Sequence, residues 1–486
     1  MQKNKKDQSI LIANSVGMDE AGNKYIVFPS RWSAKVGKYR SFCFYPYELA
    51  YLSTLLKKDD RYQVVMVDGN YEALSWKEYF EKYKNVRPDY LVMETSSVVY
   101  QDDLKFALAF KKKFKTKLIF CGQHPTAYPL QVIEDGVDFV CLGEYEMTVL
   151  DIIRGKKKSD IAGVYPNKRR ELLDINSLPF PEDEDIARIN YSNIGGCDYR
   201  EIEFFASRGC KMNCTFCVAR QAYYDKPNFR ERNINSIIEE IKYLKNKYPQ
   251  MEGVFFDEEN HNTSVDFVYR LCASIKENSL EKLKYDAMCG YWTLDEKVMK
   301  EMKSAGYYKI RIGVESVGRQ TGLGMKKNIN VERMLEVLRK AKMLGIRMYG
   351  TFTFGAMGST LKEDKETIKF LSKLIDEGLM YDFQTSICTP QPGTPFFAYL
   401  EEKKYLKTKD WDKYDGNTAV FEYPDYSKEE IESNVAAAYF LYVRAMLRNR
   451  GLARLFWEQF RIGGLGGLGS KILAFLKTKM AYRKYM

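Results

Sequence analysis

Short hydrophobic runs alternate with amphipathic stretches over the first third of the chain. Runs rich in Val, Ile, Leu and Phe lie at residues 9–16 or 24–30, 62–69, 88–97, 116–126 and 137–146. Between them, apolar residues recur at helical spacing. Nearly continuous apolar strands separated by helices predict a parallel sheet that is covered on both faces. We therefore expect a Rossmann-like α/β domain over residues 1–160.

Polar residues and glycines follow three of these expected strands. Ligands of open parallel sheets bind beyond the carboxyl ends of the strands, so residues at those ends are candidates for ligand contacts. They are Glu94, Thr95 and Ser96, then Gly122, Gln123 and His124, and finally Gly143 and Glu144. The domain has no GxGxxG sequence and so lacks the fingerprint of a dinucleotide site.

A cysteine-rich loop follows an expected strand at residues 201–207. Cys210, Cys214 and Cys217 have C-x3-C-x2-C spacing. Three thiolates can bind three irons of a 4Fe–4S cluster and leave the fourth iron open to a small molecule. A closed cluster or zinc site normally takes a fourth protein ligand, which Cys197 could supply. A zinc site in a nucleic-acid-binding module is therefore the alternative from a different class.

Residues 209–218, with a Phe before the last cysteine, resemble the signature of radical S-adenosylmethionine (SAM) enzymes. The resemblance implies a partial (β/α)6 barrel over residues 198–400, a 4Fe–4S cluster on the three cysteines, and SAM on the open iron. Strand-like and helix-like segments alternate as far as residue 395, which fits such a barrel. Chemistry in strand–helix barrels takes place at the carboxyl ends of the strands.

The resemblance also implies SAM contacts at the ends of later barrel strands. Asp257 and Glu258 match an acidic motif near the SAM amino group. Glu315 and Ser316 match a motif that meets the ribose. The glycine- and proline-containing segments beside ribose and adenine correspond to Gly355, Pro392 and Gly393. For Asp257 and Glu315, a strand-end carboxylate that caps or pairs locally is the structural alternative.

The order of the two domains resembles the cobalamin-binding branch of radical SAM enzymes. The joining segment 161–197, with LPFP at 178–181, looks like the linker of that branch, and the resemblance covers about residues 25–425. It implies cobalamin at the strand ends of the front domain. Around His124, Gly122 and Ala127 break the DxHxxG pattern of His-ligated cobalamin. The resemblance therefore implies His-off cobalamin.

Enzymes of this branch form a deoxyadenosyl radical, and the leading function is methylation of an unactivated carbon in a small-molecule or lipid substrate. Cyclisation, rearrangement or oxidation without methyl transfer is the alternative within the branch. An electron donor such as flavodoxin or ferredoxin is implied as a partner.

Methylthiotransferases acting on tRNA carry a second cluster, but Cys43, Cys121 and Cys141 are scattered and indicate buried hydrophobic positions. Cys388 is a candidate to face the active site, and no motif identifies the substrate.

Composition supports a folded protein that contains reduced cysteines. The 486 residues are 45% hydrophobic and 29% charged, with a net charge of +11. No secretory or membrane-spanning segment is evident, so we expect a cytoplasmic protein. Cytoplasmic thiols stay reduced, which favours buried or metal-binding cysteines over disulfides.

We expect residues 401–486 to form a mostly helical, basic extension. A capping box from Ser427 to Glu430 predicts a helix start. After residue 449, eight Lys and Arg residues oppose one Glu, so much of the excess charge lies in this tail and gives little support to nucleic-acid binding. The amphipathic segment 470–479 either packs on the barrel or contacts the inner face of a membrane.

Overall fold

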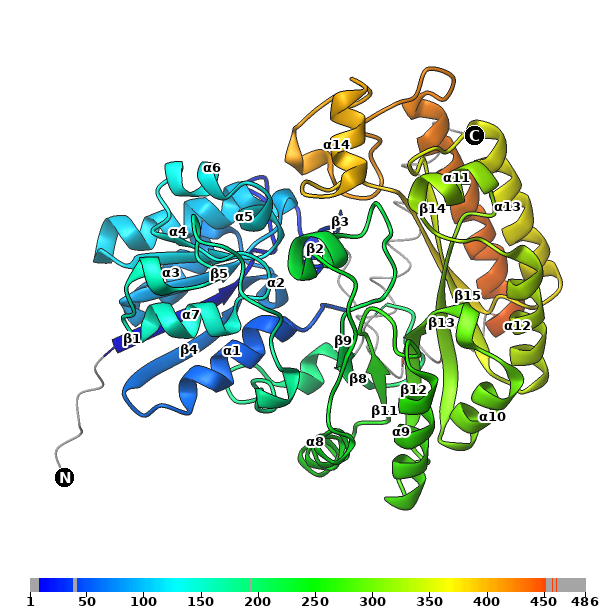
Figure 1. Cartoon of the computed structure of the whole chain (residues 1–486), viewed down its shortest axis with the longest axis horizontal. Coiled ribbons are helices and arrows are strands. Elements are labelled where there is room, and N and C mark those ends of the chain that lie inside the picture. The colour runs from blue at the N-terminus through cyan, green and yellow to red at the C-terminus, as the bar shows by residue number, and fades with distance from the viewer. Residues whose placement is uncertain (1–7, 38–41, 193–194, 452–456, 458–459, 461–486) are drawn as a thin grey trace.

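The computed structural model describes residues 8–37, 42–192, 195–451, 457 and 460. Figure 1 shows two α/β lobes side by side, the front domain in blue and cyan and the barrel in green and yellow. A segment of the front domain reaches across to the barrel between them. The expected α/β class and the order of the two domains are confirmed.

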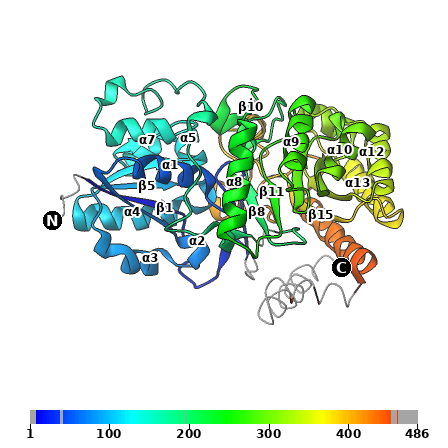
Figure 2. The same ribbon diagram turned by 90° about the horizontal axis from the view of Figure 1, so that it is seen from below.

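The front domain contains a five-stranded parallel sheet in the order β4-β1-β5-β6-β7. Its strands are β1 (Gln8–Asn14), β4 (Tyr62–Asp68), β5 (Tyr90–Glu94), β6 (Lys117–Cys121) and β7 (Phe139–Val140). Figure 2 shows α1 (Tyr47–Lys57) and α7 (Glu146–Ile153) on one face, with α3 (Trp76–Tyr83) and α4 (Tyr100–Phe114) on the other. This order is flavodoxin-like, and the strand order reverses between β1 and β5, where such sheets bind ligands.

The structure decides which hydrophobic run opens this sheet. Residues 9–14 lie in β1, the strand between β4 and β5. Residues 25–27 form β2 (Tyr25–Val27), which pairs antiparallel with β3 (Lys35–Gly37) outside the sheet. We call residues 25–37 the bridging hairpin, because its Arg31 and Ser30 contact residues of the barrel.

The barrel is an open, six-stranded parallel sheet in the order β15-β14-β13-β12-β11-β8. Its strands are β8 (Glu201–Phe204), β11 (Gly253–Phe256), β12 (Lys284–Cys289), β13 (Tyr307–Glu315), β14 (Arg347–Phe354) and β15 (Asp382–Ile387). The outer helices are α8 (Ile234–Lys247), α9 (Val265–Glu277), α10 (Glu296–Ser304), α12 (Val331–Met343) and α13 (Leu361–Asp376). The run expected at 201–207 is divided, since Ser207 and Arg208 form a separate strand, β9, paired with β10 (Arg230–Glu231).

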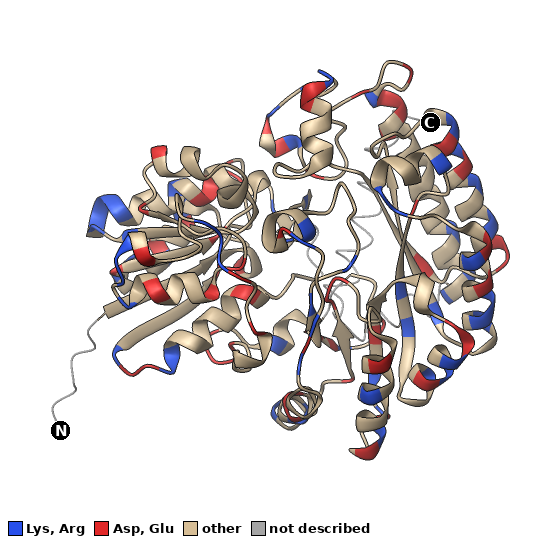
Figure 3. Ribbon diagram, in the orientation of Figure 1, with Lys and Arg blue, Asp and Glu red and all other residues tan. Residues whose placement is uncertain are grey.

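Side chains of the barrel strands alternate between two environments. In β8, Ile202 and Phe204 belong to the hydrophobic core, whereas Glu201 and Glu203 face polar partners. In β13, Ile310 and Ile312 are in that core, and the intervening Lys309 and Arg311 pair with Asp286 of β12. The apolar face therefore packs under the helices and the charged face lines the barrel interior. Figure 3 shows Lys, Arg, Asp and Glu interspersed on the outer helices.

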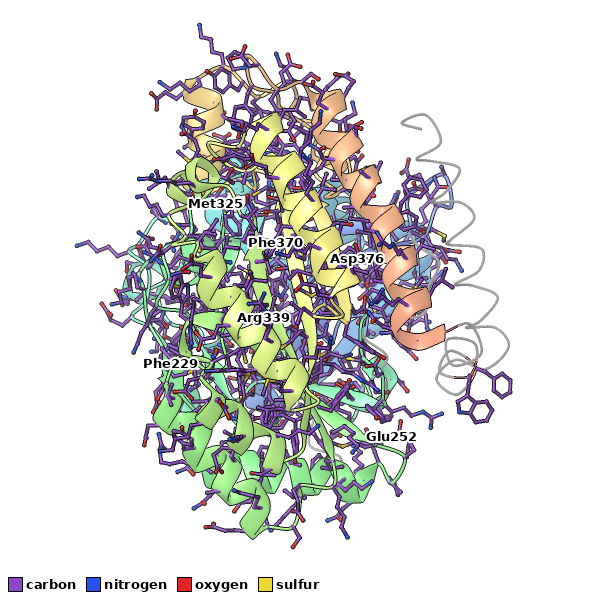
Figure 4. The ribbon with its side chains drawn as sticks, turned by 90° about the vertical axis from the view of Figure 1, so that its right-hand side faces the viewer. Phe229, Glu252, Met325, Arg339, Phe370 and Asp376 are labelled. Carbon is purple, nitrogen blue, oxygen red and sulfur yellow. The ribbon has the colours of Figure 1, made fainter. Side chains whose placement is uncertain are left out.

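A helix at residues 428–451 closes the described part of the C-terminal extension. The predicted capping box is confirmed, because Ser427 and Glu430 exchange hydrogen bonds between side chain and backbone. Figure 4 shows this helix beside α13, which carries Phe370 and Asp376. Residues 403–427 are largely irregular, and the segment 470–479 lies outside the described residues. No helix in the described ranges is long and apolar enough to cross a membrane.

Candidate active site

The cysteine loop is fixed on both sides by backbone hydrogen bonds. Gly209 has a φ of +94°, and a Cβ there would lie 2.1 Å from the Asn228 side-chain oxygen. The amide of Asn228 donates to the Cys210 carbonyl at 3.1 Å. Thr215 donates from its amide to the Met325 carbonyl at 3.1 Å. The glycine before the first cysteine is therefore required by a close backbone approach.

The three thiols lie in a partly buried, low-polarity setting. Burial raises the pKa of Cys210 to about 11 and that of Cys217 to about 12. Backbone amides of Met212 and Arg220 donate to the Cys210 and Cys217 sulfurs at 3.4 and 3.5 Å. Iron binding deprotonates such thiols, and the amide donors stabilise the resulting sulfur charge.

The three sulfurs of the cysteine loop do not form a compact set of metal donors. Among the described residues, the one set of three metal-donor side chains with all donor atoms within 4.8 Å is Cys197, Glu201 and Asp286. The thiols of the loop are spaced more widely, whereas sulfurs on one zinc ion sit at bonds of about 2.3 Å. A 4Fe–4S cluster places each thiolate on a different iron and so does not need the three sulfurs to share one ion.

Cys197 does not lie with the cysteine loop. It precedes β8, whereas the loop follows this strand, and its sulfur accepts a hydrogen bond from Arg311 at 3.2 Å. Arg311 also pairs with Asp286 at 2.6 Å. A guanidinium thus already occupies this buried group of donors, and Cys197 is not a fourth cluster ligand.

The acidic motif after β11 divides into three different environments. Asp257 pairs with Arg31 at 3.1 Å. Glu258 turns into the core and contacts His261 Nδ1 at 2.6 Å. Glu259 accepts hydrogen bonds from the Gly209 amide at 2.9 Å and from the Tyr224 hydroxyl at 2.7 Å. Of the two residues predicted from the motif, Asp257 faces the domain interface and Glu258 does not.

Arg31 of the bridging hairpin is buried among carboxylates of both domains. Besides Asp257, it lies 3.7 Å from Glu203 of β8 and 3.9 Å from Glu48 of α1. Its guanidinium also stacks over Phe205, 4.2 Å from the ring centroid. Burial raises the pKa of Asp257 and of Glu48 to about 7, against the opposing effect of Arg31. The carboxylates therefore hold Arg31, a cation of the front domain, at the carboxyl end of the barrel strands.

Glu315 has a strained backbone at the end of β13. Its φ is +62°, and the pairing of β13 with β14 shifts register beside it. Its carboxylate pairs with Lys327 at 3.0 Å and accepts from the Thr351 hydroxyl at 3.3 Å. A Cβ on Gly313 would meet the Glu315 oxygen at 2.5 Å, so only glycine leaves room for this pair. Left-handed backbone at a non-glycine residue concentrates at functional sites.

The remaining residues assigned to SAM lie in connecting segments. Ser316 is buried and hydrogen-bonds Thr367 at 3.2 Å. The Gly355 amide donates to Asp364 at 2.8 Å, and its φ is +72°. The Pro392 carbonyl accepts from Gln123 at 2.7 Å, and a Cβ on Gly393 would contact Ala127 at 3.3 Å. Pro392 and Gly393 therefore contact the front domain. Buried Cys388 lies close enough to Glu315 and Cys214 for both to raise its pKa.

A small, partly enclosed pocket lies at the switch point of the front-domain sheet. Its lining includes Asn14 and Ser15 at the end of β1, Glu94 and Ser96 at the end of β5, and the hairpin residue Ser30. The Ser96 hydroxyl oxygen is buried without a hydrogen-bond partner. The residues predicted at the end of β5 thus lie at the place where sheets of this order take ligands.

Glu94 joins the front domain to the barrel. Its carboxylate accepts hydrogen bonds from Ser30 at 2.5 Å, from Tyr145 at 3.0 Å and from the hydroxyl of Tyr223, which follows the cysteine loop. Burial raises the pKa of Glu94, whereas these donors lower it. Thr95 instead donates to the buried Asp103 at 2.5 Å.

His124 is fully buried in the short helix that follows β6. Its ring stacks on Tyr100 at 4.0 Å, and Nδ1 contacts the Ser97 hydroxyl at 2.9 Å. Burial lowers its pKa to about 3. Unlike His124, the two residues before it face the bridging hairpin. Gly122 has a φ of +101° and lies beside Ser30, and Gln123 hydrogen-bonds both Ser33 and the Pro392 carbonyl.

Gly143 and Glu144 lie where the front domain meets the segment after the cysteine loop. A Cβ on Gly143 would be 2.9 Å from the Tyr223 carbonyl oxygen. Glu144 pairs with Arg230 at 2.8 Å and with Arg208 at 3.3 Å. Glu144 therefore connects the domains through ion pairs with the barrel.

Sequence reasoning missed Arg31, Tyr223 and Lys327. Glu259 belongs to the acidic motif 256–259 that the sequence indicated, although only Asp257 and Glu258 were assigned to SAM. Lys327 and Arg31 lie in segments with no signature of their own. Only the tertiary structure brings these two side chains next to the site.

Residues 205–371, from the end of β8 into α13, match the Radical SAM superfamily. The barrel is a radical SAM domain. Such domains use a 4Fe–4S cluster and SAM, and the cysteine loop at the carboxyl end of β8 carries three thiols of the kind that bind such a cluster. The chain is therefore an enzyme of the radical SAM type.

Two curated proteins resemble the chain over most of its length. An uncharacterized methyltransferase of Pyrococcus horikoshii is 26% identical over 81% of this chain and 86% of its own. The bacteriochlorophyllide d C-8(2)-methyltransferase of Chlorobaculum tepidum is 24% identical over 74% of this chain and 80% of its own. In both, the similarity extends well beyond the radical SAM domain.

A solved structure shows the same arrangement of domains. It is the radical SAM methyltransferase TsrM from Kitasatospora setae, with cobalamin and a 4Fe–4S cluster bound. Its TM-score is 0.61 at 14% identity, and the match covers 83% of this chain and 76% of TsrM. This similarity confirms the fold of the front domain together with the radical SAM domain.

Proposed function

We propose that this radical SAM enzyme binds cobalamin in its front domain and transfers a methyl group to an unactivated carbon. The observation that carries the proposal is the convergence of the β1–β5 switch point and the cysteine loop on one interface, joined by the Tyr223–Glu94 hydrogen bond. The methyltransferase names of the relatives support the type of reaction.

The residues of the chain divide the work between two sites. Cys210, Cys214 and Cys217 would hold three irons of the cluster, which with SAM supplies one-electron cleavage of a sulfonium. Glu315 would bind polar groups of SAM beside Cys214, because the partly buried Lys327 next to it fixes its carboxylate and also acts on the Cys214 thiol. Asp257 would orient the amino group.

The front domain would hold cobalamin over the pocket formed by Asn14, Ser15, Glu94 and Ser96. His124 would not ligate its cobalt, because the ring is fixed against Tyr100 and Ser97. The bridging hairpin covers this pocket, so it would shift to admit a corrin. The substrate would be a small molecule or a lipid, and an electron donor such as flavodoxin or ferredoxin would reduce the cluster.

Reconstitution with iron and sulfide under anaerobic conditions tests the cluster. The Cys214→Ala variant should lose the iron and sulfide content and the visible absorption of a 4Fe–4S cluster, because only two thiolates remain. Cys197→Ala is the matched control and should retain both. Equal losses in the two variants, or zinc alone in the wild-type protein, would contradict the cluster assignment.

Anaerobic turnover with SAM carrying a deuterated methyl group tests the reaction. Metabolite and lipid extracts serve as the source of substrate, and mass spectrometry follows the label. We expect deuterium in the product. A product without the label would exclude methyl transfer and favour cyclisation, rearrangement or oxidation.

A further inference from the structure

Arg220 is a buried cation that has no counter-ion among the residues that the structure describes. It lies in the π-helical turn Ala219–Tyr224 (η6), three residues after Cys217, and is 8% exposed. Its Nε and Nη1 are buried without a hydrogen-bond partner. The guanidinium makes no ion pair with any residue in the described ranges. Single π-helical turns are often found at functional sites.

Other buried arginines of the chain are paired with carboxylates. Arg311 lies 2.6 Å from Asp286, and Arg208 lies 2.7 Å from Glu146. Arg232 likewise pairs with Glu240 at 2.6 Å. A buried charge without a partner is strongly unfavourable, so Arg220 differs from these in a way that calls for an external anion.

The acids around η6 are already bound by other donors. Tyr223 donates to Glu94, and Tyr224 donates to Glu259 at 2.7 Å. Arg230 pairs with Glu144 at 2.8 Å. Tyrosines on the same turn thus occupy the carboxylates on both sides of the interface, which leaves the Arg220 guanidinium available.

The position of Arg220 places it between the cluster loop and the front domain. Its own amide donates to the Cys217 sulfur at 3.5 Å. The turn packs against α5 (Gln123–Ala127), and its Tyr223 carbonyl lies against Gly143. A ligand that reaches Arg220 is therefore next to the proposed reaction site.

We propose that Arg220 binds a carboxylate or phosphate group of a ligand held between the cluster loop and the front domain. The planar guanidinium matches both groups, which it can bind through two parallel hydrogen bonds. SAM carries one such carboxylate, and an acidic or phosphorylated substrate would carry another. This inference rests on the proposed function only for the identity of the ligand, because the unpaired cation is independent of the reaction.

Thermal unfolding of the full-length protein tests the anion site. Added inorganic phosphate or acetate, at constant ionic strength, should raise the melting temperature of the wild-type protein. Arg220→Met should melt higher than wild type without the anions, because an unpaired charge is removed, and should lose the response to them. Lys226→Met removes an exposed lysine of the same segment and should respond as wild type does.

Calorimetric titration with SAM and with decarboxylated SAM identifies the source of the anion. If SAM supplies it, Arg220→Met binds SAM roughly 10-fold or more weakly, and decarboxylated SAM binds both proteins equally. If the substrate supplies it, SAM affinity is unchanged, and phosphate still stabilises the SAM-bound wild-type protein. Either result supports the proposal.

The proposal is overturned if neither anion stabilises the wild-type protein and the variant binds SAM normally. It is also overturned if Arg220→Met responds to the anions as wild type does. None of these measurements needs turnover. A failure of methyl transfer would therefore leave the anion site standing, and loss of the anion site would leave the reaction type untouched.

Discussion

At the scale of single residues, His124 shows how packing decides the role of a conspicuous side chain. It lies at the end of a parallel strand, where ligand contacts are expected, yet its ring is enclosed by Tyr100, Tyr128 and Trp411. The resulting pKa of about 3 keeps the folded protein from protonating it. The unfolded chain takes up this proton at about pH 6.5.

His124→Phe should therefore make the protein less sensitive to acid. Stability from the neutral ring is present above about pH 6.5 and is lost as the pH falls, by about 2 kcal/mol near pH 5. The melting temperature of the wild-type protein should fall by a few degrees relative to His124→Phe between about pH 7 and pH 5. A pH-independent difference would contradict the assignment of a depressed pKa.

Residues differ in how far the sequence could predict their roles. Cys210, Cys214 and Cys217 could be singled out from the sequence because one short loop carries all three thiols. Asp257 was predictable in position, but its partner Arg31 comes from 226 residues earlier in the chain. Glu258 was assigned to SAM by its motif, and only the fold shows that it turns toward His261.

At the scale of elements, the C-terminal helix combines a predictable start with an unpredictable end. Ser427 and Glu430 mark its start in the sequence, because a capping box is local. Its far end places the buried Arg450 against Asp198 at 3.0 Å and Asp382 at 2.7 Å. These acids precede β8 and open β15, so no local pattern reveals the contact.

Arg450→Met should destabilise the barrel strongly. The substitution leaves Asp382 buried without its cation, which costs about 3 kcal/mol or more. Arg448→Met is the control, because Arg448 is exposed and, among the described residues, donates only to the Asp376 carbonyl. Chemical denaturation should show a large loss for the first variant and little change for the second. Similar losses of unfolding free energy in the two variants would mean that the buried ion pairs of Arg450 are not what stabilises the barrel.

At the scale of the whole molecule, Arg31 makes the two domains depend on one another. The hairpin that carries it starts in the front domain and ends among Glu203 and Asp257 of the barrel. The strand patterns predicted both sheets, because apolar runs report burial. These patterns could not predict that the bridging hairpin contacts the barrel, because a hairpin outside a sheet has no distinctive hydrophobic periodicity.

Arg31→Met should weaken the protein in a pH-dependent way. Three buried carboxylates would lose their shared cation, at a cost of about 3–5 kcal/mol. The pKa values of Asp257 and Glu48 are already about 7, so at lower pH these carboxylates become protonated and no longer need a cation. The loss of melting temperature should be larger at about pH 8 than at about pH 6. Lys35→Met, which removes a pair with the exposed Asp412, should show no such dependence.

A buried network of ion pairs around Lys309 fills the barrel at the amino end of its strands. Lys309, Asp198 and Asp286 are buried at the amino end of the strands, and Arg450 covers them from outside. This network fills the amino end of the strands, so we expect ligands to reach the site from the carboxyl end, under the front domain. A product that remains at that end blocks the next substrate, so we expect competitive product inhibition.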